Sequence, residues 1–241
     1  MQGAVKVGCC GFPIARARYA EQFPLVEAQE TFYQPPEQKT LERWRAVVPA
    51  EFEFTLKAWQ VITHPATSPT YRRLREKFSE TQKRQCGSFQ WTGVTEQAWE
   101  RTAASARALR ARIILFQCPA SFKPTIENKD NLWKFFHRIK RENFLLAWDP
   151  RGQWSGEEIA TLCRELNLIH AVDPFHAEPV TSGVCYFRLH GRTGYRYRFT
   201  EADLAELAAR CQTADPTYVL FNNVSMLDDA QSFMARVSLR L

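Results

Sequence analysis

Short apolar runs alternate with amphipathic stretches along the whole chain of 241 residues. The clearest run covers residues 52–58, where Phe52, Phe54 and Leu56 alternate strictly with polar residues. This period of two is typical of a β-strand. Similar runs predict further strands at residues 5–8, 26–32, 112–117, 144–148, 168–172, 185–189 and 218–221.

The amphipathic stretches between these runs predict helices, and two of them carry a capping signature. Ser155 precedes a predicted helix to residue 166, and Glu158 three residues later completes a capping box. Thr200 begins another helix, with Asp203 in its first turn. The remaining helices are predicted at residues 37–48, 95–109, 127–141 and 228–240.

Strands that alternate with helices indicate a parallel sheet with crossover helices. Eight such repeats in 241 residues favour a closed barrel over an open doubly wound sheet. We therefore expect the α/β class, with a (β/α)₈ TIM-like barrel as a single domain over residues 1–241. Two irregularities are predicted: a long, basic third βα region at residues 59–93, and a reduced sixth helix, because only residues 174–183 separate strands six and seven.

Polar residues gather where the predicted strands end, which is the end of such barrels that carries chemistry. The candidate site residues are Glu27, Tyr33, Lys57, His64, Asp149, Arg151, Asp173, Arg188, His190 and Asn222. Strand parity sharpens the choice in residues 185–189. If the alternate apolar residues face the helices, Arg188 and His190 point into the barrel, where a buried arginine needs an anionic partner or ligand. By the same reasoning, Lys57 points inward.

Each candidate also has a purely structural interpretation. Arg188 and Asp173 could form a buried ion pair, since structural ion pairs are common. His190 could cap the turn at Gly191, and Asn222 and Asn223 could hold loop backbones. The arginines at residues 72–75 could be a solvated helix face.

The net charge of +6 favours anionic partners such as phosphates or nucleic acid, although no block of like charges stands out. The odd number of cysteines, seven, argues against a complete disulfide framework. None of them forms a CxxC pair, which argues against a structural zinc site. A divalent metal could be bound, but no ligand spacing indicates one, so we assign no metal or cofactor. The residues weighed as ligands are Glu27, Asp149, Asp173, His176 and His190. The chain lacks a long apolar run and a signal-peptide pattern, so we expect a cytoplasmic protein.

Several strand-end motifs appear in one order along almost the whole chain. They are VKVGCCGFP, VEAQETFYQPP, FEFTLKAWQVITH, ILFQCPASFKP, LLAWDPRGQW, LIHAVDPF, YFRLHG and YVLFNNVSMLDDAQSF. Together they resemble the YecE-like family, a group with a domain of unknown function, and WDPRGQW and HAVDPF resemble its archaeal-type branch.

The resemblance implies a (β/α)₈ barrel similar to the endonuclease IV and xylose isomerase group. It also implies a pocket made by Glu27, Thr31, Tyr33, Lys57, His64, Arg188, His190 and Asn222. The chain departs from the family pattern at Asp149, where glutamate is usual, and at Gln29, where asparagine is usual. The zinc ligands of endonuclease IV do not appear as a set, and the resemblance implies no particular reaction.

We expect an enzyme that acts on a phosphorylated or otherwise anionic substrate, including a phosphodiester in nucleic acid. In this hypothesis Arg188, Lys57 and His64 bind the anion, Glu27 or Asp149 is the general base, and His190 is a general acid or an orienting group. One alternative is a non-catalytic protein that binds nucleic acid or a small anion through residues 59–84. Another is a sugar isomerase-like enzyme.

Overall fold

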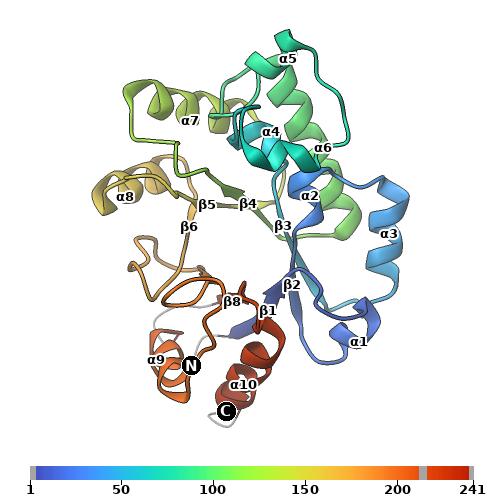
Figure 1. The fold of residues 1–241 in the computed structure, drawn as a ribbon, viewed down its shortest axis with the longest axis vertical. Helices are drawn as coiled ribbons and strands as arrows, with labels where there is room; N and C mark the ends of the chain where they lie inside the picture. The colour runs from blue at the N-terminus through green and yellow to red at the C-terminus, as the bar shows by residue number, and fades with distance from the viewer. Residues whose placement is uncertain (1–3, 212–215, 239–241) are drawn as a thin grey trace.

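The predicted strands form a closed ring of parallel strands in the computed structural model, which describes residues 4–211 and 216–238. Figure 1 looks down this ring, with the helices arranged around its outside. Each strand pairs with the next one in the chain, and β1 pairs with β8 to close the barrel. The strands are β1 (Val5–Cys10), β2 (Leu25–Ala28), β3 (Glu53–Lys57), β4 (Ile113–Gln117), β5 (Leu145–Asp149), β6 (Ile169–Val172), β7 (Cys185–Leu189) and β8 (Thr217–Phe221).

The inner face of the ring is apolar along most of its length and polar at its C-terminal end. Buried residues from several strands form one cluster inside the barrel, made of Cys10, Leu25, Ile113, Leu115, Ala147, Ala171, Tyr186, Tyr218 and Leu220. Because successive side chains alternate between the two faces of a strand, the residue two positions after Leu25, Ala147 or Tyr186 shares the inner face. Those residues are Glu27, Asp149 and Arg188. The predicted inward direction of Arg188 is therefore confirmed.

The helices pack against the outside of the ring and bury the other face of each strand. The helices are α1 (Arg16–Ala20), α2 (Glu30–Tyr33), α3 (Gln38–Ala46), α4 (Gln60–Thr63), α5 (Glu80–Arg84), α6 (Gly93–Leu109), α7 (Ile126–Arg138), α8 (Gly156–Glu165), α9 (Glu201–Arg210) and α10 (Met226–Ser238), with a 3₁₀ helix η1 (Pro69–Arg73). The end predicted for the last helix, residue 240, lies outside the described residues. No described helix is both long and apolar enough to cross a membrane.

The two capping predictions are confirmed. The Ser155 hydroxyl accepts a hydrogen bond from the backbone N–H of Glu158, and the Glu158 side chain accepts one from the N–H of Ser155. Thr200 and Asp203 make the same reciprocal pair at the start of α9. Both boxes satisfy backbone donors that the first turn of a helix leaves free.

The second strand is shorter than predicted. The expected strand at residues 26–32 ends at Ala28, and the chain turns into α2 at Glu30. The β-branched and aromatic side chains of Thr31 and Phe32 favour a strand locally, but both are buried by tertiary contacts instead. The Thr31 hydroxyl donates a hydrogen bond of 2.8 Å to the carbonyl oxygen of Lys57, which ties α2 to the end of β3.

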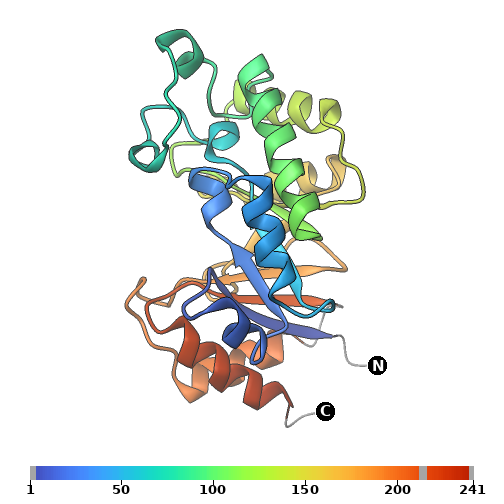
Figure 2. The ribbon, with the colours of Figure 1, turned by 90° about the vertical axis from the view of Figure 1, so that its right-hand side faces the viewer.

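The two predicted irregularities are present. The third βα region contains α4, η1 and α5 before α6 begins, whereas residues 173–184, between β6 and β7, contain no helix. In Figure 2 the chain start lies on the right, so the C-terminal ends of the strands face left. The α4–α5 segment projects on that side at the top, and the loop after β7 projects on it at the bottom. These two loops follow strands on opposite sides of the ring and therefore flank its mouth.

Candidate active site

Arg188 lies at the centre of the polar layer and is bound by carboxylates from two strands. Its side chain is 1% exposed. Its Nη2 and Nε donate to the two carboxylate oxygens of Glu27 on β2, at 2.8 and 3.0 Å. Its Nη1 donates to Asp149 Oδ2 on β5 at 2.9 Å and to Gln117 Oε1 at 3.1 Å. The structural interpretation in which Arg188 pairs with Asp173 is therefore wrong. Strand parity correctly places Arg188 inside the barrel, but its partners are the inward carboxylates of β2 and β5.

Glu27 is fully enclosed and has its hydrogen-bonding capacity in use. Besides Arg188, the carboxylate accepts hydrogen bonds from Tyr186 Oη at 2.9 Å and from the side-chain amide of Gln29. Burial alone would raise the pKa of Glu27, but the charge and hydrogen bonds of Arg188 outweigh it and hold this pKa below its ordinary value. Glu27 is thus a buried, ionised partner of Arg188, and a weak base.

Arg151 links the same network to the outside. Its Nε donates to Asp149 Oδ1 and Oδ2 at 3.0 and 3.1 Å, and its side chain is 34% exposed. Its Nη2 lies 2.8 Å from His190 Nε2. Burial tends to raise the pKa of Asp149, but the charges of Arg151 and Arg188 lower it overall. Asp149 is therefore an ionised carboxylate between two arginines.

The contact with Arg151 determines the tautomer of His190. A guanidinium can only donate, so Nε2 must accept and the ring proton must lie on Nδ1. That nitrogen lies 3.6 Å from Asp173 Oδ2, and the His190 backbone N–H donates to the same oxygen at 2.9 Å. Burial lowers the pKa of His190, and the charges of Arg188 and Arg151 lower it further against the hydrogen bond of Asp173. His190 is thus a neutral imidazole oriented by Asp173.

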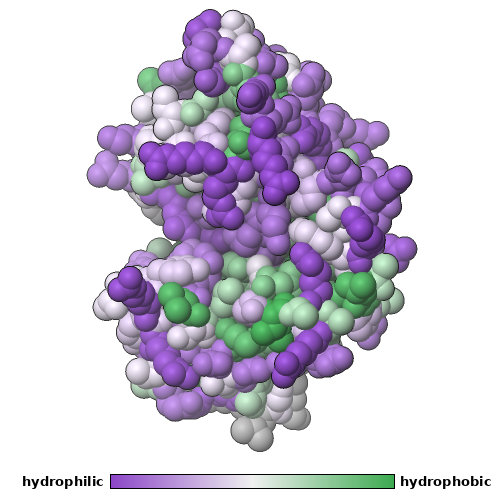
Figure 3. Space-filling model, turned by 45° about the vertical axis from the view of Figure 1, so that its right-hand side comes forward, coloured by the Kyte–Doolittle hydropathy of each residue, from purple (hydrophilic) through white to green (hydrophobic). Residues whose placement is uncertain are grey.

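A cavity of about 720 Å³ opens beside this chain of groups, at the ends of β5, β6 and β7. Its polar lining consists of Asp149, Arg151, His170, Asp173, His176, Arg188, His190 and Arg192. Figure 3, which views the molecule obliquely, shows a notch between the two halves of the surface, and the upper half is mostly hydrophilic. Another hollow, of about 530 Å³, lies between α7 and α8 and contains none of the predicted site residues.

On the β3 side of the mouth, Lys57 and His64 differ from the expected free cations. Lys57 is 5% exposed, and its Nζ lies 3.9 Å from the centre of the Phe32 ring. Burial, followed by the charge of Arg188, lowers the pKa of Lys57 to about 7. Burial also lowers the pKa of His64 to about 4, and its Nδ1 is hydrogen-bonded to the Thr63 hydroxyl at 2.7 Å. His64 is therefore uncharged near neutral pH and does not supply the positive charge expected of it.

Tyr33 and Asn222 lie at the edge of this arrangement. Tyr33 is half-buried, and the Arg73 guanidinium lies 3.5 Å from the centre of its ring. Asn222 is half-buried directly after β8. Its neighbour Asn223 holds loop backbone, because its amide donates to the Tyr197 carbonyl oxygen at 2.7 Å. Of the two asparagines, Asn223 therefore holds loop backbone, as one interpretation predicted.

A family profile described as protein of unknown function DUF72 matches residues 15–240. The chain belongs to the DUF72 family. This confirms the family resemblance drawn from the strand-end motifs. No curated protein sequence matches the chain.

Solved structures of the DUF72 family have the same fold. A DUF72 family protein from Enterococcus faecalis is 22% identical, with a TM-score of 0.76, over 99% of this chain and 98% of the other. A DUF72 family protein from Thermotoga maritima is 19% identical, with a TM-score of 0.69, over 98% and 99% of the two chains. At these identities the likeness concerns the fold alone.

More distant barrels also resemble this DUF72 member. A D-psicose 3-epimerase is 11% identical with a TM-score of 0.60, over 99% of both chains. Endonuclease IV from Thermus thermophilus is 10% identical with a TM-score of 0.51, over 99% of this chain and all of the other. The expected likeness to the endonuclease IV group is therefore confirmed for the fold.

Within residues 4–211 and 216–238, no group of three or more histidine, cysteine, aspartate or glutamate side chains is placed to hold a metal ion. The carboxylates weighed as ligands are occupied otherwise in this DUF72 member, since Arg188 lies between Glu27 and Asp149. Sequence reasoning did not include Gln117 or Gln60 in the site. The parity that pointed to Arg188 would have found Gln117, the last inward residue of β4, whereas Gln60 gives no such signal.

Proposed function

We propose that this protein is an enzyme that binds a phosphorylated or otherwise anionic substrate at the barrel mouth, with Arg151 as the anion ligand and His190 as the proton-transfer group. The observation that carries this proposal is the position of Arg151. It is partly exposed in the cavity and bridges an ionised carboxylate and a neutral imidazole.

Three arginines line the cavity, and their partners distinguish them. Arg188 is buried between two carboxylates. Arg192 is paired with Asp203 and Glu206 on α9. Arg151 shares the carboxylate of Asp149 with Arg188, and its other side-chain contact is with the uncharged ring of His190. Its Nη2 also donates to Asp149 Oδ2 at 3.1 Å. Because the planar fork of the guanidinium suits phosphate oxygens, an entering anion would replace His190 as the second partner of Nη2.

Displacement of that contact would uncover the lone pair of His190 Nε2. The opposite ring nitrogen faces Asp173, which holds the ring and stabilises the protonated form. His190 would then accept a proton from a substrate hydroxyl or a water molecule. In this proposal Glu27 and Asp149, which were expected to be general bases, position Arg188 and Arg151.

Within this class, we propose a phosphate ester as the substrate, including a phosphodiester in nucleic acid. Endonuclease IV and D-psicose 3-epimerase share this fold, and their names indicate a nucleic-acid and a sugar substrate respectively. The fold therefore leaves a sugar isomerase-like reaction as the alternative.

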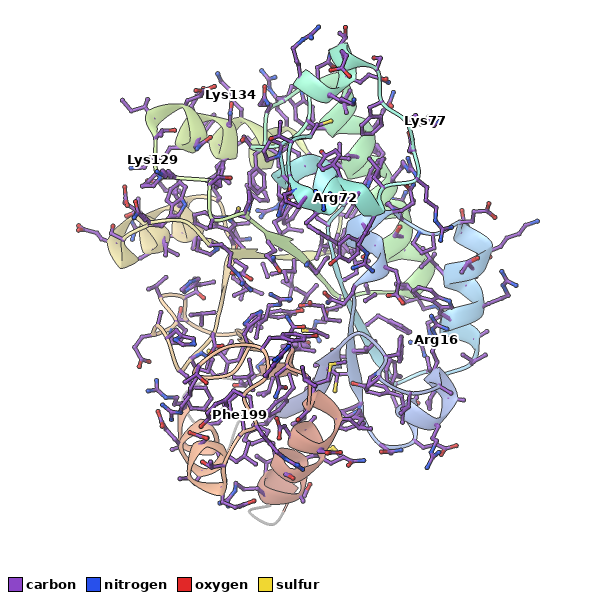
Figure 4. All side chains as sticks on the ribbon, viewed as in Figure 1. Arg16, Arg72, Lys77, Lys129, Lys134 and Phe199 are labelled. Atoms are coloured by element: carbon purple, nitrogen blue, oxygen red, sulfur yellow. The ribbon has the colours of Figure 1, made fainter. Side chains whose placement is uncertain are left out.

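Arg151→Gln tests the proposal, with Arg16→Gln as the matched control. Arg16 has nearly the same side-chain exposure, 32%, but lies on α1 away from the ring (Figure 4). Phosphate and phosphate esters should raise the melting temperature of the wild type and of Arg16→Gln, but not of Arg151→Gln. Turnover in a panel of phosphomonoesters and phosphodiesters should be lost in Arg151→Gln and His190→Gln. Equal anion binding by the wild type and Arg151→Gln would overturn the proposal.

A second candidate function is the binding of a polyanion without catalysis. Arg72 and Lys77 after β3 and Arg196 after β7 are exposed, and no carboxylate among the described residues pairs with them. Figure 4 places Arg72 and Lys77 on the α4–α5 side of the mouth. It places Phe199, which lies three residues after Arg196 in the segment that follows β7, on the opposite side. A nucleic-acid strand across the mouth could contact both loops. The affinity of the protein for nucleic acid should then fall steeply as the salt concentration rises, and an affinity that does not change with salt would refute this second function.

A further inference from the structure

We propose that Lys57 is a nucleophile that forms an imine with the aldehyde or ketone carbon of the anionic substrate, which makes the substrate an open-chain phosphorylated sugar. This inference rests on the proposed function, because Arg151 supplies the phosphate site. It goes further by assigning the amine a covalent role and by naming the carbonyl group.

The surroundings of Lys57 leave its amine available for a reaction. Among the described residues, none accepts a hydrogen bond from its Nζ, and none forms an ion pair with it. By contrast, Lys6 on β1 forms an ion pair with Glu53. The Lys57 side chain ends against the Phe32 ring and keeps 5% exposure at the mouth. A desolvated lysine beside another cation is the usual setting of Schiff-base lysines.

A second polar side chain close to Lys57 in the chain also lacks a full set of partners. Gln60 lies three residues after Lys57 and is fully buried. Its amide nitrogen donates to the Tyr33 carbonyl oxygen at 2.9 Å, but its Oε1 has no partner among the described residues. A buried acceptor without a donor costs about 1–3 kcal/mol.

The charges around Lys57 adjust its protonation to this role. Burial and Arg188 favour the neutral amine, while Glu27, Asp149 and Cys10 favour the charged one. His64, which also faces Lys57, is neutral. The balance gives Lys57 a pKa of about 7, so a large fraction of the amine is unprotonated at neutral pH. Ordinary lysines have a pKa of about 10.4.

The reaction needs no further reagent. The lone pair of Nζ attacks the carbonyl carbon, the π bond of the carbonyl breaks, and a proton moves from the nitrogen to the oxygen, which becomes a hydroxyl. That hydroxyl takes up a proton from the solvent and leaves as water while the nitrogen lone pair forms the C=N bond, which yields the protonated imine. The imine withdraws electrons and makes a hydrogen on the adjacent carbon acidic, so that a base such as His190 can remove it.

Two sources can present this chemistry: a free sugar phosphate, and the ring-opened sugar of a nucleotide that has lost its base within a strand. Pyridoxal phosphate is a suitable first probe, because it carries both an aldehyde and a phosphate. The protein would be incubated with pyridoxal phosphate and sodium cyanoborohydride between pH 6 and 9, and the adduct located by peptide mass spectrometry. Pyridoxal, which lacks the phosphate, is the matched probe.

We expect Lys57 to be modified at least about tenfold faster than exposed lysines such as Lys39, with a rate that rises around pH 7. Lys57→Met and Lys57→Arg should lose the adduct, and Lys39→Arg should keep it. Ribose 5-phosphate and an oligonucleotide with one base-free residue then separate the two sources, because only the true class should be trapped efficiently.

The outcomes separate the two proposals. Modification of Lys57 by pyridoxal phosphate and much less by pyridoxal supports both. Equal modification by the two probes supports the nucleophile and contradicts the anion site. If Lys57 in the folded wild type reacts no faster than Lys39, the imine proposal is overturned, even when phosphate still binds through Arg151. The wild-type measurement needs no variant, so a misfolded Lys57→Met cannot obscure the result.

Discussion

Glu27→Gln removes one negative charge from the buried centre of the barrel and changes almost nothing in shape. In the wild type, Glu27 is 0% exposed and binds Arg188 through both carboxylate oxygens at 2.8 and 3.0 Å. Glutamine would keep one acceptor but turn its NH₂ group towards the donors of Arg188 or Gln29. Arg188 would retain Asp149 at 2.9 Å and Gln117 at 3.1 Å.

Removing one partner of a buried ion pair costs about 3–5 kcal/mol of unfolding free energy. Because Arg188 keeps a second carboxylate, we expect the lower end, about 3 kcal/mol. The double variant Glu27→Gln/Arg188→Met should lose less than the sum of the single variants, by about 1–3 kcal/mol, because it leaves neither charge alone. Urea unfolding at pH 7, followed by tryptophan fluorescence and circular dichroism, measures both quantities.

The pH dependence provides an independent check of sign. The pKa of Glu27 is lowered in the folded protein from an ordinary value of 4.5. Its contribution to stability is therefore complete above about pH 4.5 and is lost as the pH falls through the lowered folded value. Because Glu27 also raises the pKa of Lys57, the gap between the wild type and Glu27→Gln should widen as the pH falls from 7 to 5 and then shrink below about pH 4.5 as Glu27 itself is protonated.

Glu201→Gln is the control, because Glu201 pairs with Arg236 on the surface and is 78% exposed. It should change the unfolding free energy by less than about 0.5 kcal/mol. The reasoning is refuted if Glu27→Gln costs under about 1 kcal/mol, or if the double variant is additive, because the buried pair would then carry little energy.

Three further changes test other parts of the structure. Lys57→Met should raise the unfolding free energy at pH 7–8, because the folded protein disfavours the protonated amine that the unfolded chain carries. This gain should shrink towards pH 10.5, and urea unfolding across the pH range measures it. A difference that does not depend on pH would contradict the prediction. Ser155→Ala should cost about 1 kcal/mol in the same assay, because α8 loses its N-cap. Gly8→Ala should cost about 1–3 kcal/mol, because its Cβ would lie 2.1 Å from the carbonyl oxygen of Leu25 on the adjacent strand; an unchanged melting temperature would show that β1 and β2 can separate freely.

Local patterns were sufficient to predict much of the fold. The strict alternation at residues 52–58 corresponds to β3, and the parity of residues 185–189 correctly placed Arg188 inside the barrel. The capping signatures at Ser155 and Thr200 located two helix starts. These features depend on neighbours within a few positions, which the sequence displays directly.

The partners within the site could not be predicted in the same way. Arg188 and Glu27 are 161 residues apart in the chain, and the ring geometry alone brings them together. The sequence suggested Asp173 as the partner because it also ends a strand. In the structure Asp173 instead accepts from the backbone of His190. The lowered pKa of Lys57 and the neutral state of His64 arise from burial, which no local pattern reveals.

The charges of the mouth imply that anion binding is coupled to protons rather than driven by a surplus of positive charge. The cations Arg188 and Arg151 are balanced by Glu27 and Asp149, and the overall charge of +6 has little bearing on the cavity. An anion added beside Arg151 stabilises the protonated form of any amine or imidazole nearby. Lys57 interacts electrostatically with Arg188, Glu27 and Asp149 of the same polar layer, and its pKa of about 7 makes it the group that would respond near neutral pH. Anion binding should therefore take up protons, and its affinity should fall as the pH rises through about 7.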